Sequence, residues 1–201
     1  MKTKLFFVIA FTLFVQIANA QRIGIKAGVN FANMNFSSSG VSMSPKSITA
    51  FHAGLVADFK CVNNLYFNTG LLYSLKGTKM DLGGINGTDK IHYLEIPLNM
   101  AYKFSITETS DFFIQAGPYL AYGLSGKDKS DGITTDLFSE KLVKRFDWGL
   151  GFGGGVELGS IVASLNYQLG LADLNDDSTT NATIKSKVFQ ISLAYMFGSK
   201  R

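Results

Sequence analysis

Large apolar residues and small or polar residues alternate along most of this chain. In the clearest case, near the C-terminus, every second residue is large and apolar: Phe189, Ile191, Leu193, Tyr195 and Phe197. Successive side chains of a β-strand point to opposite faces, so this spacing gives a strand one apolar face. Residues 65–76, 91–104 and 161–171 repeat the pattern. A helical period of 3.6 residues is not sustained after residue 20, and the sequence therefore predicts an all-β protein.

The alternation divides the chain into eight strands joined by connections of two kinds. The predicted strands are residues 22–34, 48–59, 65–77, 91–104, 112–124, 145–158, 161–171 and 186–197. Long connections rich in Ser, Gly, Asp, Asn and Lys lie at 35–47, 78–90, 125–144 and 172–185. Short connections lie at 60–64, 105–111 and 159–160. An even number of strands, with long loops at one end and short turns at the other, indicates an antiparallel up-and-down barrel.

The polar face of these strands carries so many glycines that it does not resemble a solvated exterior. Small and charged residues mixed together suit a narrow polar lumen, whereas the apolar face suits a lipid-facing band with aromatic girdles. A tilted strand crosses a bilayer with roughly 9–11 residues, which each predicted strand can supply. Closing the sheet pairs every edge, as a membrane requires. We therefore expect an eight-stranded antiparallel up-and-down transmembrane β-barrel.

Charged residues occur at lumen-facing positions of the predicted barrel. The candidates are Lys26, Lys76, Glu95, Lys103, Asp147 and Glu157. We expect opposite charges to neutralise one another there, because an unpaired charge in a narrow lumen is costly. Side chains just fill the interior of an eight-stranded barrel, so no open solute pore is expected.

The N-terminus has the features of a secretory signal peptide. Lys2 and Lys4 form a positive n-region, residues 5–17 are almost entirely apolar, and Ala18-Asn19-Ala20 is a small-x-small cleavage site. The apolar stretch is shorter than the roughly 20 residues of a spanning helix. We therefore expect a cleaved signal peptide at 1–20 and a barrel domain at 21–201.

Net charge and motifs give little indication of a cofactor or of nucleic acid. Removing Lys2 and Lys4 leaves 17 basic residues against 15 acidic ones, a net charge of +2. The single Cys61 has no partner within the chain for a disulfide. Residues 173–177 are acidic but lack the glycine and distal glutamate of an EF-hand loop. The G-x-G-x-x-G match at 149–154 is followed by a turn and a strand, not by the helix that a dinucleotide site needs. We expect no metal and no cofactor.

Four segments resemble a known family. They are RIGIKAGVNFANM (22–34), YLEIPLNMAYKF (93–104), FFIQAGPYLAYGLSG (112–126) and FQISLAYMF (189–197). Together they resemble the small outer-membrane β-barrel family that includes PorT-like proteins, most specifically at Glu95-Ile-Pro97 and Ala116-Gly117-Pro118. The resemblance implies a barrel in the outer membrane of a Gram-negative bacterium, surrounded by outer-membrane lipid. Most members have no defined activity. The secretion role of the PorT branch is not carried over, because the match is to the general domain.

The last strand resembles the signal by which the barrel-assembly machinery recognises outer-membrane barrels. Such strands alternate apolar residues and place an aromatic residue near the end, as Tyr195 and Phe197 do here. The four residues that follow Phe197 depart from a strictly terminal aromatic. The same two side chains also suit a lipid-facing girdle, and both roles are compatible.

Three classes of function remain after these steps. The first is a structural or interaction scaffold whose surface loops, above all 125–144, contact an envelope partner. The second is a narrow channel or a component of an outer-membrane transport or secretion complex. The third is an enzyme that modifies lipid A, for which His92 and Glu95 are poorly placed because they point to opposite faces of a strand. We expect the scaffold and no catalytic chemistry.

Overall fold

The computed structural model describes residues 22–38, 41–43, 45–82, 85–130, 133–140, 142–176 and 182–198. The expected signal peptide lies outside these residues. The strands are β1 (Arg22–Ser38), β2 (Val41–Met43), β3 (Lys46–Val62), β4 (Leu65–Leu82), β5 (Ile85–Ser105), β6 (Ser110–Ser130), β7 (Ile133–Asp136), β8 (Phe146–Leu158), β9 (Ile161–Gly170) and β10 (Ala182–Phe197). In this part of the chain, no helix is long and apolar enough to cross a membrane.

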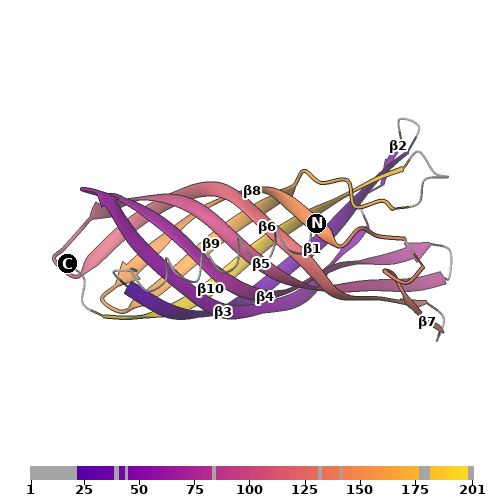
Figure 1. The fold of residues 1–201 in the computed structure, drawn as a ribbon, viewed down its shortest axis with the longest axis horizontal. Helices are drawn as coiled ribbons and strands as arrows, with labels where there is room; N and C mark the ends of the chain where they lie inside the picture. Colours follow the sequence, from indigo (N-terminus) through magenta and orange to yellow (C-terminus); the bar gives the residue numbers. More distant parts are fainter. Residues whose placement is uncertain are drawn as a thin grey trace, which may run out of the picture.

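Eight of these strands form the wall of a closed antiparallel barrel (Figure 1). Neighbours in the wall follow chain order, and β10 returns to pair with β1 from Ile23–Phe197 to Ser38–Ala182. Two short strands lie outside this wall: β2 pairs with the end of β1, and β7 pairs with the end of β6. Closure removes the free edges that a sheet would otherwise expose to lipid. The predicted fold class and the order of its eight strands are confirmed.

The strands extend further than the hydrophobic pattern predicts. Much of the expected loop 78–90 is strand, since β4 continues to Leu82 and β5 begins at Ile85. The expected loop 125–144 likewise contains the end of β6 and all of β7. Beyond the lipid, neither face needs to be apolar, so backbone pairing continues while the alternation that marks a strand disappears. Predicting these stretches as loops was wrong for that reason.

The two ends of the barrel differ in their connections. Tight turns join β3 to β4 and β8 to β9, with Asn63 at φ 40° and Gly159 at φ 61°. Such left-handed residues suit two-residue hairpin turns. Outer-membrane barrels have short periplasmic turns and longer extracellular connections. The end with these turns is therefore periplasmic, and the end with β2 and β7 is extracellular (Figure 1).

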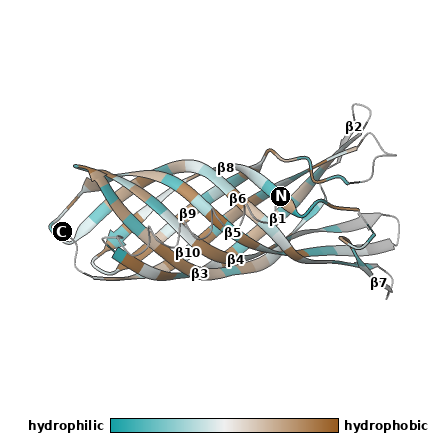
Figure 2. Cartoon of the chain, in the orientation of Figure 1, coloured by the Kyte–Doolittle hydropathy of each residue, from teal (hydrophilic) through white to brown (hydrophobic). Residues whose placement is uncertain are grey.

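Exposed apolar side chains form a band around the outside of the wall. Figure 2 shows hydrophobic and hydrophilic residues alternating along the strands that carry this band. Aromatic residues near its periplasmic side include Tyr102, Phe104, Phe112, Tyr195 and Phe197. Aromatic residues near its extracellular side include Phe51, Tyr73, Tyr122, Phe146 and Trp148. All of them are exposed in the isolated chain, as expected of a surface that lipid covers.

Candidate functional site

Charged side chains from β4, β5 and β8 meet in the middle of the lumen. Lys76 of β4 places its Nζ 2.8 Å from Oε2 of Glu95 on β5 and 3.5 Å from Oδ2 of Asp147 on β8. All three side chains are at most 1% exposed. Gln168 of β9 donates from Nε2 to Oε1 of Glu95 at 2.6 Å. We call Lys76, Glu95 and Asp147 the central cluster.

Two tyrosine rings enclose the ammonium group of the central cluster. Nζ of Lys76 lies 4.3 Å from the ring centre of Tyr119 and 5.4 Å from that of Tyr93. Tyr119 and Ser186 both donate to Oδ2 of Asp147, at 3.2 Å and 3.0 Å. The rings supply cation–π contacts and fill space around the charges. The cluster therefore occupies the lumen with paired charges and buried rings.

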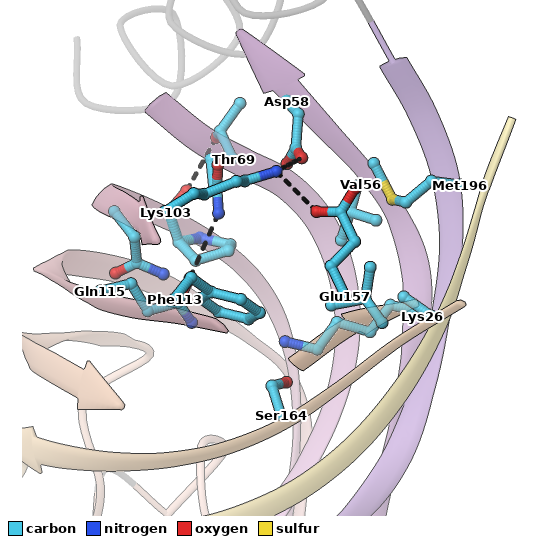
Figure 3. Close-up of a pocket in the computed structure, with 15 residues that line it drawn as sticks. Lys26, Val56, Asp58, Thr69, Lys103, Phe113, Gln115, Glu157, Ser164 and Met196 are labelled. Atoms are coloured by element: carbon cyan, nitrogen blue, oxygen red, sulfur yellow. Dashed lines mark hydrogen bonds and ion pairs between the residues drawn. The ribbon is translucent and has the colours of Figure 1, made fainter. Parts of the chain in front are cut away.

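A second ionic group lies nearer the periplasmic end, and we call Arg22, Asp58, Lys103 and Glu157 the periplasmic cluster. Figure 3 shows Lys103 reaching between two carboxylates, with Nζ 3.0 Å from Oδ2 of Asp58 and 2.7 Å from Oε2 of Glu157. Arg22 also pairs with Glu157 and donates to the carbonyl oxygen of Gly159 at 3.1 Å. Two cations thus face two carboxylates.

Arg22 and Asp58 are not among the six lumen charges that we predict from the sequence. Arg22 is the first residue of β1, so only the residues that follow it show the alternating pattern. Its even spacing from Lys26 nonetheless places both on the lumen face, and this signal could have found it. Asp58 follows the same alternation from His52 along β3.

Lys26 lies between the two clusters and extends into the cavity drawn in Figure 3. That cavity has a volume of about 60 Å³, and a second one of about 20 Å³ shares Lys26, Asn99 and Gln115 with it. A water molecule occupies about 30 Å³ in the liquid. These cavities suit a few waters between polar walls, not a hydrated solute.

The two histidines have separate environments. His52 is buried in the lumen, where Nδ1 lies 2.7 Å from Oδ1 of Asn30 and Nε2 lies 2.9 Å from Oγ of Ser192. An amide oxygen only accepts, so Nδ1 carries the proton and Nε2 accepts from Ser192. His92 faces outward and contacts the hydroxyl of Tyr73, whereas Glu95 faces the lumen. Within the described residues, His52 and His92 form hydrogen bonds with Asn30, Ser192 and Tyr73, none of which is an acid.

Apolar side chains close the extracellular mouth of the barrel. Leu137 and Val143 come from the connection between β7 and β8, and Leu174 comes from the connection between β9 and β10. All three are buried against wall residues such as Ile91 and Tyr93. Backbone hydrogen bonds hold these connections in place, including Leu137 N–H to Gly126 O at 3.0 Å and Leu174 N–H to Ile184 O at 2.9 Å. We call these buried side chains the apolar cap: Met34, Ile91, Tyr93, Tyr119, Ala121, Leu137, Val143, Ala172 and Leu174. Part of the segment 125–144, expected as an exposed partner-binding loop, is therefore packed inside the mouth.

Two carboxylates near the extracellular mouth, those of Asp136 and Asp89, interact with other groups of the protein. Asp136 accepts the backbone N–H groups of Phe138 and Ser139, both at 2.9 Å, and these bonds hold the pKa of its carboxyl below the usual value. Asp89 lies opposite Asp128 across β5 and β6. Burial, and then the charge of Asp128, raises the pKa of Asp89 to about 7. Within the described residues, His, Cys, Asp and Glu do not gather into a group of three that could hold a metal ion.

The proposed assembly signal lies on the outer surface of the last strand. Tyr195 and Phe197 are 47% and 51% exposed, and their rings meet edge to face with centroids 5.3 Å apart. Both belong to the part of β10 that pairs with β1, where the barrel closes.

The family model of the outer membrane protein beta-barrel domain matches residues 15–176. The protein belongs to that family. It is accordingly a β-barrel protein of the Gram-negative outer membrane. Among curated proteins, none matches the sequence.

Similar solved structures include surface and outer-membrane proteins. Ail, the attachment invasion locus protein of Yersinia pestis, is 17% identical with a TM-score of 0.45, over 89% of this chain and 99% of that one. Neisserial surface protein A is 15% identical with a TM-score of 0.48, over 86% and 97%. The outer membrane enzyme PagL is 13% identical with a TM-score of 0.47, over 83% and 98%. At these identities the likeness concerns the fold, and no role is transferred.

Proposed function

We propose that this protein is a structural and interaction scaffold that displays an ordered extracellular surface from a filled barrel. The filled lumen is the observation that supports the proposal best. The central cluster, the periplasmic cluster and the apolar cap occupy successive parts of the interior. The cavities beside Lys26 are the size of a few water molecules. Since transport of a solute needs more space, the surface is the better candidate for function.

The projecting strands favour a role in contact with other molecules. β5 and β6 each have 21 residues, whereas a strand crosses the membrane with roughly 9–11. Around half of each strand therefore lies beyond the lipid, where β7 pairs with the end of β6. Backbone pairing orders this surface before any partner arrives, which lowers the entropic cost of binding. An envelope protein is the partner that we propose for it.

A second candidate function is a narrow channel or a component of an outer-membrane transport or secretion complex, which is also where PorT-like membership would place the protein. The polar cavities around Lys26 favour it. A rearrangement that parts the central cluster is needed before such a path could conduct.

We propose no catalytic activity. Lipid A modification by a Ser/His/acid site needs the three groups on one side of the wall. His92 contacts Tyr73 outside, and the buried Glu95 pairs with Lys76 inside. Mass spectrometry of lipid A from cells with and without the gene should give the same acylation pattern, and a lost or gained acyl chain contradicts this part of the proposal.

We propose that Tyr195 and Phe197 also serve recognition by the barrel-assembly machinery. Their exposure at the closing strand supports this role, because the free protein presents both rings outward. The lipid-facing role remains compatible with it.

Planar-bilayer recording tests the scaffold against the channel. Purified, folded barrel should give no steady single-channel current, because the lumen is filled by side chains. Migration that changes on heating should first establish that the inserted protein is folded. Steady unitary currents from such a sample are the result that would overturn the scaffold proposal.

A further inference from the structure

Four exposed lysines gather on the outer surface near the extracellular end of the wall. Lys79 lies on β4, Lys90 on β5, and Lys127 and Lys129 on β6. Their positions alternate with inward residues such as Thr78, which is fully buried. We call these four residues the outer lysine patch.

Strand register brings the four side chains close together. Lys90 and Lys127 are directly opposite each other in the β5–β6 ladder. Thr88 is opposite Lys79 on one side and Lys129 on the other. Directly opposite residues have Cβ atoms roughly 4.5–5.5 Å apart, and diagonal neighbours are roughly 7–8 Å apart. The patch is therefore compact enough for one anionic group to contact more than one ammonium.

Neighbouring carboxylates are directed elsewhere. The ion pairs of the central and periplasmic clusters lie in the lumen, and they do not include the four lysines of the patch. Asp136 is opposite Lys127 in β7, but its carboxylate accepts two backbone N–H groups of its own turn. Asp89 and Asp128 alternate with the lysines and therefore face the other side of the sheet. Like charges directly opposite each other destabilise a sheet. An anion bound between these lysines would therefore reduce their repulsion.

The apolar band ends just below the patch. On the same outer face, the tilted rings of Tyr73 and His92 are in contact with centroids 5.7 Å apart, and Leu124 is 49% exposed. Aromatic girdles of this kind lie at the level of lipid headgroups. Phosphates are the strongest hydrogen-bond acceptors at that level, and clustered cations near a membrane recognise them.

We propose that the outer lysine patch binds the phosphate groups of an anionic lipid in the outer leaflet, with Lys90 and Lys127 as its principal contacts. The acyl chains of that lipid lie along the apolar band while its phosphates meet the ammonium groups above. This binding is independent of whether the projecting loops engage a protein partner.

Adding each probe in increasing amounts to the folded protein in a neutral detergent, and measuring bound probe by native mass spectrometry, tests whether the patch binds lipid phosphates. The probes are bisphosphorylated lipid A, the same lipid after removal of its phosphates, and inorganic phosphate. The protein should prefer the phosphorylated lipid, and Lys90→Gln with Lys127→Gln should weaken that binding about thirtyfold, since each lysine near an anionic surface contributes about fivefold. Lys90→Arg with Lys127→Arg should retain it.

Lys60→Gln is the control, because Lys60 is also an exposed lysine near a strand end but lies toward the periplasm. Its lipid affinity should stay within about twofold of the unmodified protein, well below the effect of the double change. Should the double variant not fold, the single change Lys127→Gln takes its place. Equal binding of the dephosphorylated lipid, equal competition by inorganic phosphate, or an equal loss in Lys60→Gln overturns the proposal.

Discussion

The two ends of the lumen are closed by opposite chemistries. Toward the periplasm, Lys103 and Arg22 face Asp58 and Glu157 beside a small polar cavity. Toward the cell exterior, the apolar cap closes the mouth with side chains such as Leu174, which is fully buried. Between them, the central cluster combines buried charge with tyrosine rings.

The difference follows from what each end must exclude and from which residues can reach it. Near the periplasm the wall supplies every side chain, and short turns leave nothing else to fold inward. At the exterior the β7–β8 and β9–β10 connections are long enough to bring Leu137, Val143 and Leu174 back over the opening. Charged pairs fix geometry but depend on every partner, whereas apolar packing loses stability in smaller steps. The comparison therefore predicts unequal responses to substitution.

The largest effect is expected at the central cluster. Lys76→Met removes the cation that pairs with Glu95 and Asp147 and leaves two carboxylates buried without it. We expect a loss of about 3–5 kcal/mol in the free energy of unfolding. Urea unfolding in lipid vesicles measures it, with the fluorescence of Trp148, the one tryptophan in the chain, as the signal.

A matched variant separates lost pairing from lost packing. Lys76→Met combined with Glu95→Gln and Asp147→Asn removes the orphaned charges and should recover most of the stability. If the combined variant is no more stable than Lys76→Met alone, the cluster acts through packing against Tyr93 and Tyr119, and the ionic explanation is wrong.

A smaller effect is expected at the apolar cap. Leu174→Ala removes a fully buried side chain, and a core change of this kind costs about 2–5 kcal/mol. Because Leu174 belongs to a connection and not to a strand of the wall, we expect the loss to appear first as local opening, at the low end of that range. Hydrogen exchange should accelerate at 137–143 and 172–175 while β3 to β5 stay protected. Uniform acceleration across the wall contradicts a separately opening cap.

The barrel was predictable from the sequence because lipid on one side and a filled lumen on the other force strict alternation. Within β10, for example, Gln190 and Ser192 are buried while Ile191 and Leu193 are exposed, as the period of two requires. The same alternation placed Lys76, Glu95 and Asp147 on one face. Which lumen charges pair with one another depends on strand register and shear, and the alternating pattern contains no information on either. The division of these charges into two clusters was therefore not predicted.

The apolar cap was missed for a related reason. Leu137 and Val143 each belong to a pair of apolar residues within a polar connection, and Leu174 has a polar residue on either side. Scattered apolar residues at a protein surface are ordinary. Nothing in their spacing indicates burial, because the surface that buries them is the barrel mouth formed by distant strands. The projecting ends of β5 and β6 were missed because pairing outside lipid imposes no alternation.

The smallest predicted effect concerns two glycines of β8, Gly151 and Gly155, which differ in the space beside them. A Cβ at Gly151 has Cγ of Gln168 as its nearest atom, 3.7 Å away, beside the smaller cavity. A Cβ at Gly155 meets the carbonyl oxygen of Ala163 and lies 2.9 Å from Cζ of Phe113. Gly155→Ala should therefore lower the free energy of unfolding by about 1–3 kcal/mol, as overpacking does. Gly151→Ala should change it little, because ordinary contact distances are kept. The same vesicle assay measures both, and since the two changes add an identical methyl group to one strand, an equal loss would mean that glycine serves the bending of β8 and not the space inside it.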